Sequence, residues 1–145
     1  MVDIGIRALS PAINDPSTAV QALDRVGDFL RHVISRRLVP ASTAAIDERQ
    51  DVFIRLPRWS DFLELAFTEF REYGSGSVQV MRKTRAVLDV LRASAPASRQ
   101  ASIDREFALL DAAVERAWAD PARRQIALTA DGQGLGGGET AHGMM

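Results

Sequence analysis

The side chains best suited to chemistry lie near the start of the chain, in the stretch RALSPAINDPSTAV. Five of its polar residues could act together on a ligand: Arg7, Ser10, Asn14, Asp15 and Thr18. Asp15 followed by Pro16 is typical of a helix start, because Asp caps the first N–H groups and Pro is tolerated at the first helical position. Free N–H groups there favour an anion, and the Arg7 guanidinium could assist its binding. These five residues are therefore the candidate ligand-binding residues.

A structural interpretation of the same stretch is also open. In it, Asp15 or Thr18 caps the helix and Asn14 bonds the turn backbone. Arg7 then pairs with Asp3 or with Asp15 instead of a ligand. Capping alone accounts for most of these residue types. Both the ligand-binding and the structural interpretation therefore remain open.

The rest of the sequence predicts no catalytic or metal site. There is no Cys, and neither His32 nor His142 has a His or carboxylate partner at zinc-binding spacing. The glycine-rich stretch GQGLGGG lacks the preceding strand and following helix of a phosphate-binding loop. We expect no catalytic residues, no metal and no cofactor.

Composition places the chain among ordinary globular domains. It has 145 residues, of which 46% are hydrophobic and 26% charged, and the net charge is −1. Nucleic-acid binding usually needs a basic excess, so we expect no nucleic-acid partner. No apolar run approaches the roughly 20 residues that span a bilayer, and no signal peptide is evident. The chain alone is therefore expected to be soluble and cytoplasmic.

Hydrophobic periodicity predicts a mainly α fold, a bundle of about five or six helices. The expected helices are residues 1–9 as the end of a truncated helix, 16 to before Pro40, 61–73 with a cap at Ser60, 78 to before Pro96, about 98–118, and 121 to about 128. A small β-hairpin is expected within 39–58, between the second and third helices. A lone hairpin is only marginally stable, so it should pack on the helices.

The same pattern predicts which faces are buried. One face of the third helix carries Phe62, Leu63, Ala66, Phe67, Phe70 and Tyr73, which we expect in the core. Arg71, the stretch 82–85 and the cluster 31–37 are expected to be solvated basic faces. Residues 1–130 should form one domain. Residues 131–145 are glycine-rich and poor in apolar side chains, which predicts a disordered tail.

The opening stretch also carries a resemblance to a known family. Residues 3–19 have the order D-x-G-x-R-A-L-S-P-A-I-N-D-P-x-T-A, followed by QALDRV at 21–26 and REYG at 71–74. This order resembles the signature of the DUF2254 family of predicted bacterial membrane proteins. The resemblance implies transmembrane helices in the N-terminal part of the family, followed by a soluble region, and no assigned activity. It implies that this chain is the soluble part of a truncated parent.

Two functions follow as hypotheses. The first is a non-enzymatic domain for interaction or sensing, in a parent that is membrane-associated and faces the cytoplasm. Its partners would be the missing N-terminal membrane region or another copy of itself, with anionic lipid headgroups near the basic faces. An apolar edge of Val2, Ile4, Ile6 and Leu9 should then be exposed. The alternative is a small-molecule or anion-binding domain, which could be enzymatic, with a pocket at Ser10–Thr18.

Overall fold

A computed structural model describes residues 1–36, 44–47, 50–52 and 57–132. Within them lie six helices: α1 (Val2–Ala8), α2 (Pro16–Ile34), α3 (Trp59–Gly74), α4 (Val78–Ser94), α5 (Ala97–Ala117) and α6 (Pro121–Ala127). The predicted mainly α fold is confirmed. α3 begins before the predicted Ser60 cap, because Arg58 is its N-cap residue and donates its backbone N–H to the Asp61 carboxylate at 2.9 Å.

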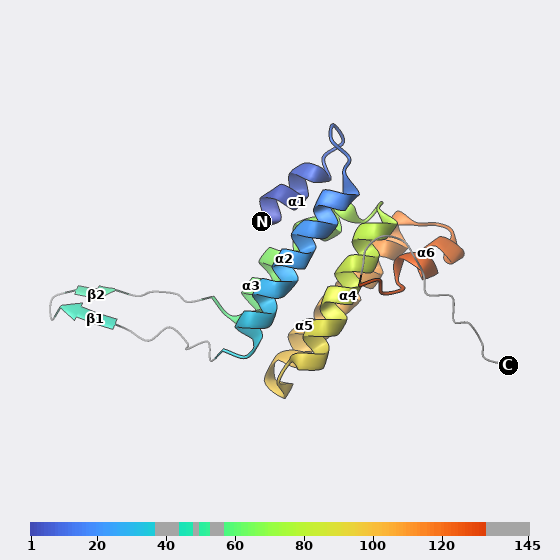
Figure 1. The fold of residues 1–145 in the computed structure, drawn as a ribbon. Coiled ribbons are helices and arrows are strands. Elements are labelled where there is room, and N and C mark those ends of the chain that lie inside the picture. Colours follow the sequence, from blue (N-terminus) through green and yellow to red (C-terminus); the bar gives the residue numbers. More distant parts are fainter. Residues whose placement is uncertain (37–43, 48–49, 53–56, 133–145) are drawn as a thin grey trace.

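The long helices α2, α3, α4 and α5 form a bundle, and the short α1 and α6 lie near one end of it (Figure 1). α4 is the central helix, since it contacts α2, α3, α5 and α6. α2 and α4 approach closely at Gly27, where an added Cβ would come within 3.0 Å of Val87. A larger residue at Gly27 would therefore push these two helices apart.

One continuous apolar core holds the bundle together. Its largest fully buried side chains are Phe67, Phe70, Leu23, Leu30, Leu63, Met81, Leu88, Leu91, Ile103 and Leu110. They come from the four long helices, so each of these helices buries one stripe. The aromatic face predicted for α3 is confirmed at Phe67 and Phe70, whereas Tyr73 is 59% exposed and does not belong to the core. Tyr73 lies at the edge of the predicted stripe, on the solvent side of α3.

α1 is a helix, as predicted, and it packs on α2 and α3. Its buried residues are Gly5 and Ala8. An added Cβ at Gly5 would overlap the Phe70 ring and lie 3.2 Å from the Ala22 Cβ, so only glycine permits this approach. The small residues of α1 therefore form its closest contact with the bundle.

Two strands lie between α2 and α3, β1 (Ala44–Asp47) and β2 (Gln50–Val52). They pair antiparallel, with Ala44 opposite Val52 and an irregularity between Ala45 and Asp47. The contacts described for these strands are with each other, and in Figure 1 they lie away from the helices. The structure therefore does not support the predicted hairpin as an element packed on the bundle. Residues 53–56, predicted to continue the second strand, lie outside the described residues.

Arg99 of α5 holds the end of α2 close to the start of α3. Its guanidinium donates to the carbonyls of Val33 at 2.8 Å, Ile34 at 2.7 Å and Arg36 at 2.6 Å. It also lies over the Trp59 ring, 5.1 Å from the centroid. The last carbonyls of a helix lack intrahelical partners, so Arg99 caps α2 from a different helix. α2 accordingly ends at Ile34, before the predicted stop at Pro40.

The stretch predicted as a tail begins with two residues that contact α4. The Asp131 backbone N–H donates to the Arg82 carbonyl at 3.3 Å, and the two side chains form an ion pair at 3.5 Å. The Lys83 ammonium donates to the Gly132 carbonyl at 2.6 Å. Residues 133–145 lie outside the described part of the chain. Arg82 and Lys83 are buried, so the prediction of a solvated basic face at 82–85 was wrong for these two residues.

Candidate functional site

The predicted Ser10–Thr18 loop leads directly into α2, and Asp15 is its N-cap. The Asp15 carboxylate accepts from the backbone N–H groups of Ser17 at 3.1 Å and Thr18 at 3.2 Å. It also accepts from the Thr18 hydroxyl at 2.6 Å. The carboxylate therefore occupies the place at the helix start where a bound anion would receive the same hydrogen bonds.

The other predicted residues of the loop have mainly backbone roles. The Ser10 carbonyl accepts from the N–H groups of Ile13 at 3.0 Å and Asn14 at 2.8 Å. Asn14 has a φ of 45°, a left-handed conformation that Asn tolerates better than most residues. The exposed Arg7 side chain makes no hydrogen bond or ion pair with the described residues, so the expected pairing with Asp3 or Asp15 is not seen there. The structure thus brings together Asp15 and Thr18, and not the whole predicted set.

The hydrogen bonds to Asp15 predict a pH-dependent contribution to stability. The Thr18 hydroxyl, then the Thr18 and Ser17 N–H groups, lower the pKa of Asp15 from its usual 3.8, against a small opposing effect of burial. Asp15→Ala should lower Tm at pH 7 by removing the cap. Because the folded pKa is lowered, the charge contributes above pH 3.8 and is lost as pH falls through the folded value. Asp15→Asn should therefore have a lower Tm than wild type at pH 7 and converge with it in acid. A constant difference between pH 7 and pH 2.5 would contradict this.

An exposed apolar surface lies on α2 and α3, beside the start of α1. A groove of about 180 Å3 is lined by Met1, Val2, Val26, Phe29, Leu30, Phe62, Leu65 and Ala66, and we call it the apolar groove. Leu65 is 71% exposed, Met1 66% and Phe29 52%. The Phe29 and Phe62 rings contact each other at a centroid distance of 6.1 Å. Three helices thus present large apolar side chains to one hollow.

This surface differs in part from the predicted apolar edge. Ile4 is exposed, as predicted, and lines an adjoining groove with Met1. Val2 and Leu9 instead pack partly against the core. Sequence periodicity did not single out Phe29 of α2 or Leu65 of α3, because both lie off the main apolar stripe of their helices.

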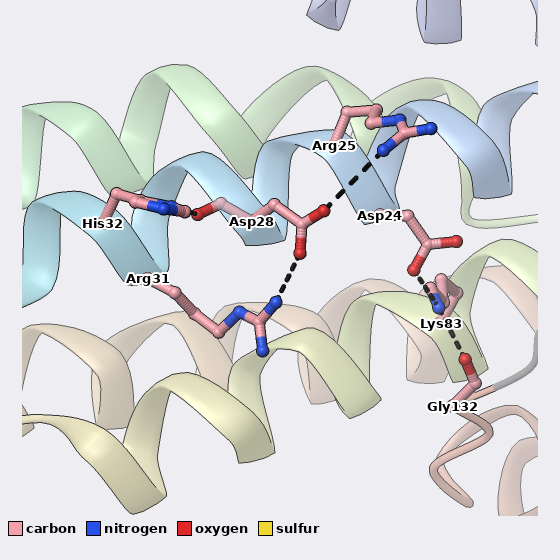
Figure 2. Close-up of polar contacts among 7 residues, drawn as sticks. All are labelled: Asp24, Arg25, Asp28, Arg31, His32, Lys83 and Gly132. Carbon is pink, nitrogen blue, oxygen red and sulfur yellow. Dashed lines mark hydrogen bonds and ion pairs between the residues drawn. The ribbon is translucent and has the colours of Figure 1, made fainter.

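A second groove, of about 190 Å3, lies between α2 and α4 and is bordered by charged residues. Figure 2 shows Lys83 reaching from α4 to an ion pair with Asp24 and to the Gly132 carbonyl. Asp28 accepts from Arg31 at 2.5 Å, and its carbonyl lies 2.7 Å from the His32 Nδ1. Each carboxylate drawn there has a cationic partner. This network holds α2, α4 and the chain at Gly132 together.

A third groove, between α3 and α5, contains a buried ion pair of Arg71 and Glu106. Arg71 was predicted on a solvated basic face, and that prediction was wrong because Glu106 binds it inside the bundle. Burial raises the pKa of Glu106 above its usual 4.5, and the nearby Glu64 charge adds to this. The Arg71 charge and hydrogen bond, and then the Arg105 charge, only partly oppose the effect.

The described helices do not include one long and apolar enough to cross a membrane. Among the described residues, no group of three or more His, Asp or Glu side chains is arranged to hold a metal ion.

Comparison with known proteins gives a family but no assigned activity. The model of a family described as a predicted membrane protein, DUF2254, matches residues 1–90. Uncharacterised proteins of Mycobacterium tuberculosis and Mycobacterium bovis are 32% identical over 135 residues, which is 90% of this chain and 25% of each relative. The chain thus spans a quarter of the length of these curated relatives. No solved structure matches.

Proposed function

This chain belongs to the DUF2254 family of predicted membrane proteins, and from that premise we propose that it is a non-enzymatic docking domain. The apolar groove carries the proposal. Its exposed rim of Met1, Phe29 and Leu65 would leave water if an apolar segment covered it. Burial of such side chains contributes roughly 25 cal/mol per Å2 of apolar surface, which favours a partner at this groove.

The proposed occupant is an apolar helix from the membrane region of a DUF2254 protein. The family description supplies the membrane character, and the curated relatives are about four times longer than the part that this chain matches. A groove bordered by α1, α2 and α3 suits a helix that inserts apolar side chains at one-turn spacing. A second copy of the chain is the competing occupant, and the experiment below separates the two.

Exposed basic residues on α1 and α2 favour a position beside an anionic membrane surface. Arg25 lines the groove that adjoins the apolar one, and its side chain is largely exposed. Arg7 is also exposed and lies on α1. Each such residue near anionic headgroups contributes about 1 kcal/mol. We place the domain on the cytoplasmic side, where the leaflet is negatively charged.

The docking proposal predicts a loss of binding for changes at the groove rim. This chain would be co-purified with the remaining part of the Mycobacterium tuberculosis relative, solubilised in detergent. Leu65→Ser and Phe29→Ser should each weaken retention at least tenfold, because a polar side chain would then face the apolar helix. Ile126→Ser, at an exposed residue of α6, is the matched control and should bind as wild type does.

Two results would contradict the proposal. Retention that is equal for wild type and both rim variants would show that the groove is not the docking surface. A dimer of the isolated chain in sedimentation, lost in Leu65→Ser, with no retention by the membrane part, would identify a second copy as the occupant.

A further inference from the structure

The groove between α3 and α5 has a volume of about 450 Å3 and shares no lining residue with the apolar groove. Its α3 side presents Glu64, Thr68 and Arg71, which follow one another at close to one helical turn. Its α5 side presents Arg105 and Glu106. Two guanidinium groups and two carboxylates therefore face a hollow large enough for a small molecule.

Arg71 has hydrogen-bonding capacity that the described residues leave unused. The residue is 9% exposed, and its guanidinium donates to the Glu106 carboxylate and, at 3.2 Å, to the Thr68 hydroxyl. A guanidinium has five N–H donors, so three of them have no acceptor among the described residues. A largely buried cation with free donors beside a groove is well suited to bind a carboxylate in bidentate geometry.

Glu106 has a matching need for a cation. It is 5% exposed, and Arg71 is the only partner that donates to it among the described residues. Burial raises its pKa although the charges of Arg71 and Arg105 oppose the change. A further cation beside the carboxylate would favour its charged form.

The remaining lining residues indicate the character of the ligand. Glu64 and Arg105 are exposed on the two sides of the groove and add one charge of each sign. Leu63 and Leu109 provide an apolar part, and Leu109 is partly open to solvent. A simple anion would meet two carboxylates, and a simple cation would meet two guanidinium groups. A molecule with both charges and an apolar group matches the whole lining.

We propose that this groove binds an aliphatic α-amino acid as its zwitterion, with the ligand carboxylate on Arg71 and Arg105 and the ligand ammonium on Glu64 and Glu106. The aliphatic side chain packs against Leu63 and Leu109. Partial burial strengthens these ion pairs relative to water, because screening is weaker inside the groove. The assignment is independent of the docking proposal, since the two surfaces have no residue in common.

The test is a titration of the isotope-labelled chain with L-leucine, followed by amide chemical shifts. Saturable shifts are expected on α3 and α5. Two analogues of L-leucine each lack one of its charged groups: 4-methylpentanoate lacks the amine, and isoamylamine lacks the carboxylate. Each should bind at least tenfold more weakly than L-leucine. Arg105→Gln and Glu64→Gln should also weaken L-leucine binding at least tenfold. Arg116→Gln, at an exposed position of α5 that does not line the groove, should leave it unchanged.

The substitutions at Glu64 and Arg105 are at exposed positions, so these variants should retain the fold. Tm values equal to that of wild type would verify this. The absence of saturable shifts with L-leucine overturns the proposal. So does equal affinity for 4-methylpentanoate, which would make the groove a site for simple anions. Binding that is unaffected by both Arg105→Gln and Glu64→Gln would place the ligand elsewhere on the chain.

Discussion

Arg71→Ala should destabilise the chain by about 3–5 kcal/mol at pH 7, because it leaves Glu106 buried without its partner. Both side chains are at most 10% exposed, so water replaces the lost guanidinium only in part. Denaturant midpoints at constant slope would measure the change. The double variant Arg71→Met, Glu106→Leu should recover most of the loss, since an apolar pair of similar size needs no charge partner.

A companion variant, Glu106→Gln, shows the effect of the charge alone. The folded pKa of Glu106 is raised above 4.5, so its contribution to stability is present below pH 4.5 and is lost as pH rises through the folded value. Gln is not charged at any pH. Its stability should therefore equal that of wild type near pH 4 and exceed it at pH 7. A variant less stable than wild type at pH 7 would show that the Arg71 ion pair outweighs the burial of Glu106.

Phe67→Ala should cost about 3–5 kcal/mol, the usual range for removing a buried aromatic ring. Phe67 is 0% exposed and lies in the continuous core, so the change would leave a cavity inside the bundle. The free energy of unfolding in denaturant measures the loss. Partial refilling by neighbouring side chains would place the result at the low end of the range.

Leu65→Ala is the matched control, two residues earlier on the same helix. Leu65 is largely exposed, so the change should alter stability by less than about 0.5 kcal/mol. If Leu65→Ala were the more destabilising of the two, α3 would face the bundle differently from the structure. Arg82, which sequence alone suggested as a silent surface position, is unsuitable for this role because its ion pair with Asp131 is buried.

Sequence predicted those parts of the fold that depend on local interactions. Asp15-Pro16 and Asp120-Pro121 both start helices, and in each case the Asp carboxylate caps the N–H groups that follow. A cap and its donors lie within three residues of one another, so the pattern is visible without knowledge of the tertiary structure. The stripe around Phe67 was visible for the same reason, through its helical spacing.

The buried cations could not be found in this way. Arg71 pairs with a residue 35 positions later, and Arg82 and Lys83 donate to carbonyls 47 and 49 positions later. In sequence these residues resemble any exposed arginine or lysine of a helix, since their partners are set by how α3, α4 and α5 pack. The grooves were missed for a related reason: each is formed by residues of at least two helices, and the predicted loop site lay within one segment.

Arg99 also bears on how far the segment between α2 and α3 can change in length. Its guanidinium binds the Arg36 carbonyl and lies over the Trp59 ring, so one side chain fixes the points where the chain leaves and rejoins the bundle. Doubling the length of a segment closed between two fixed points costs only about 0.6 kcal/mol. We therefore expect that residues added between these points would cost the bundle little. The same position would accept an inserted reporter domain for following the protein in cells.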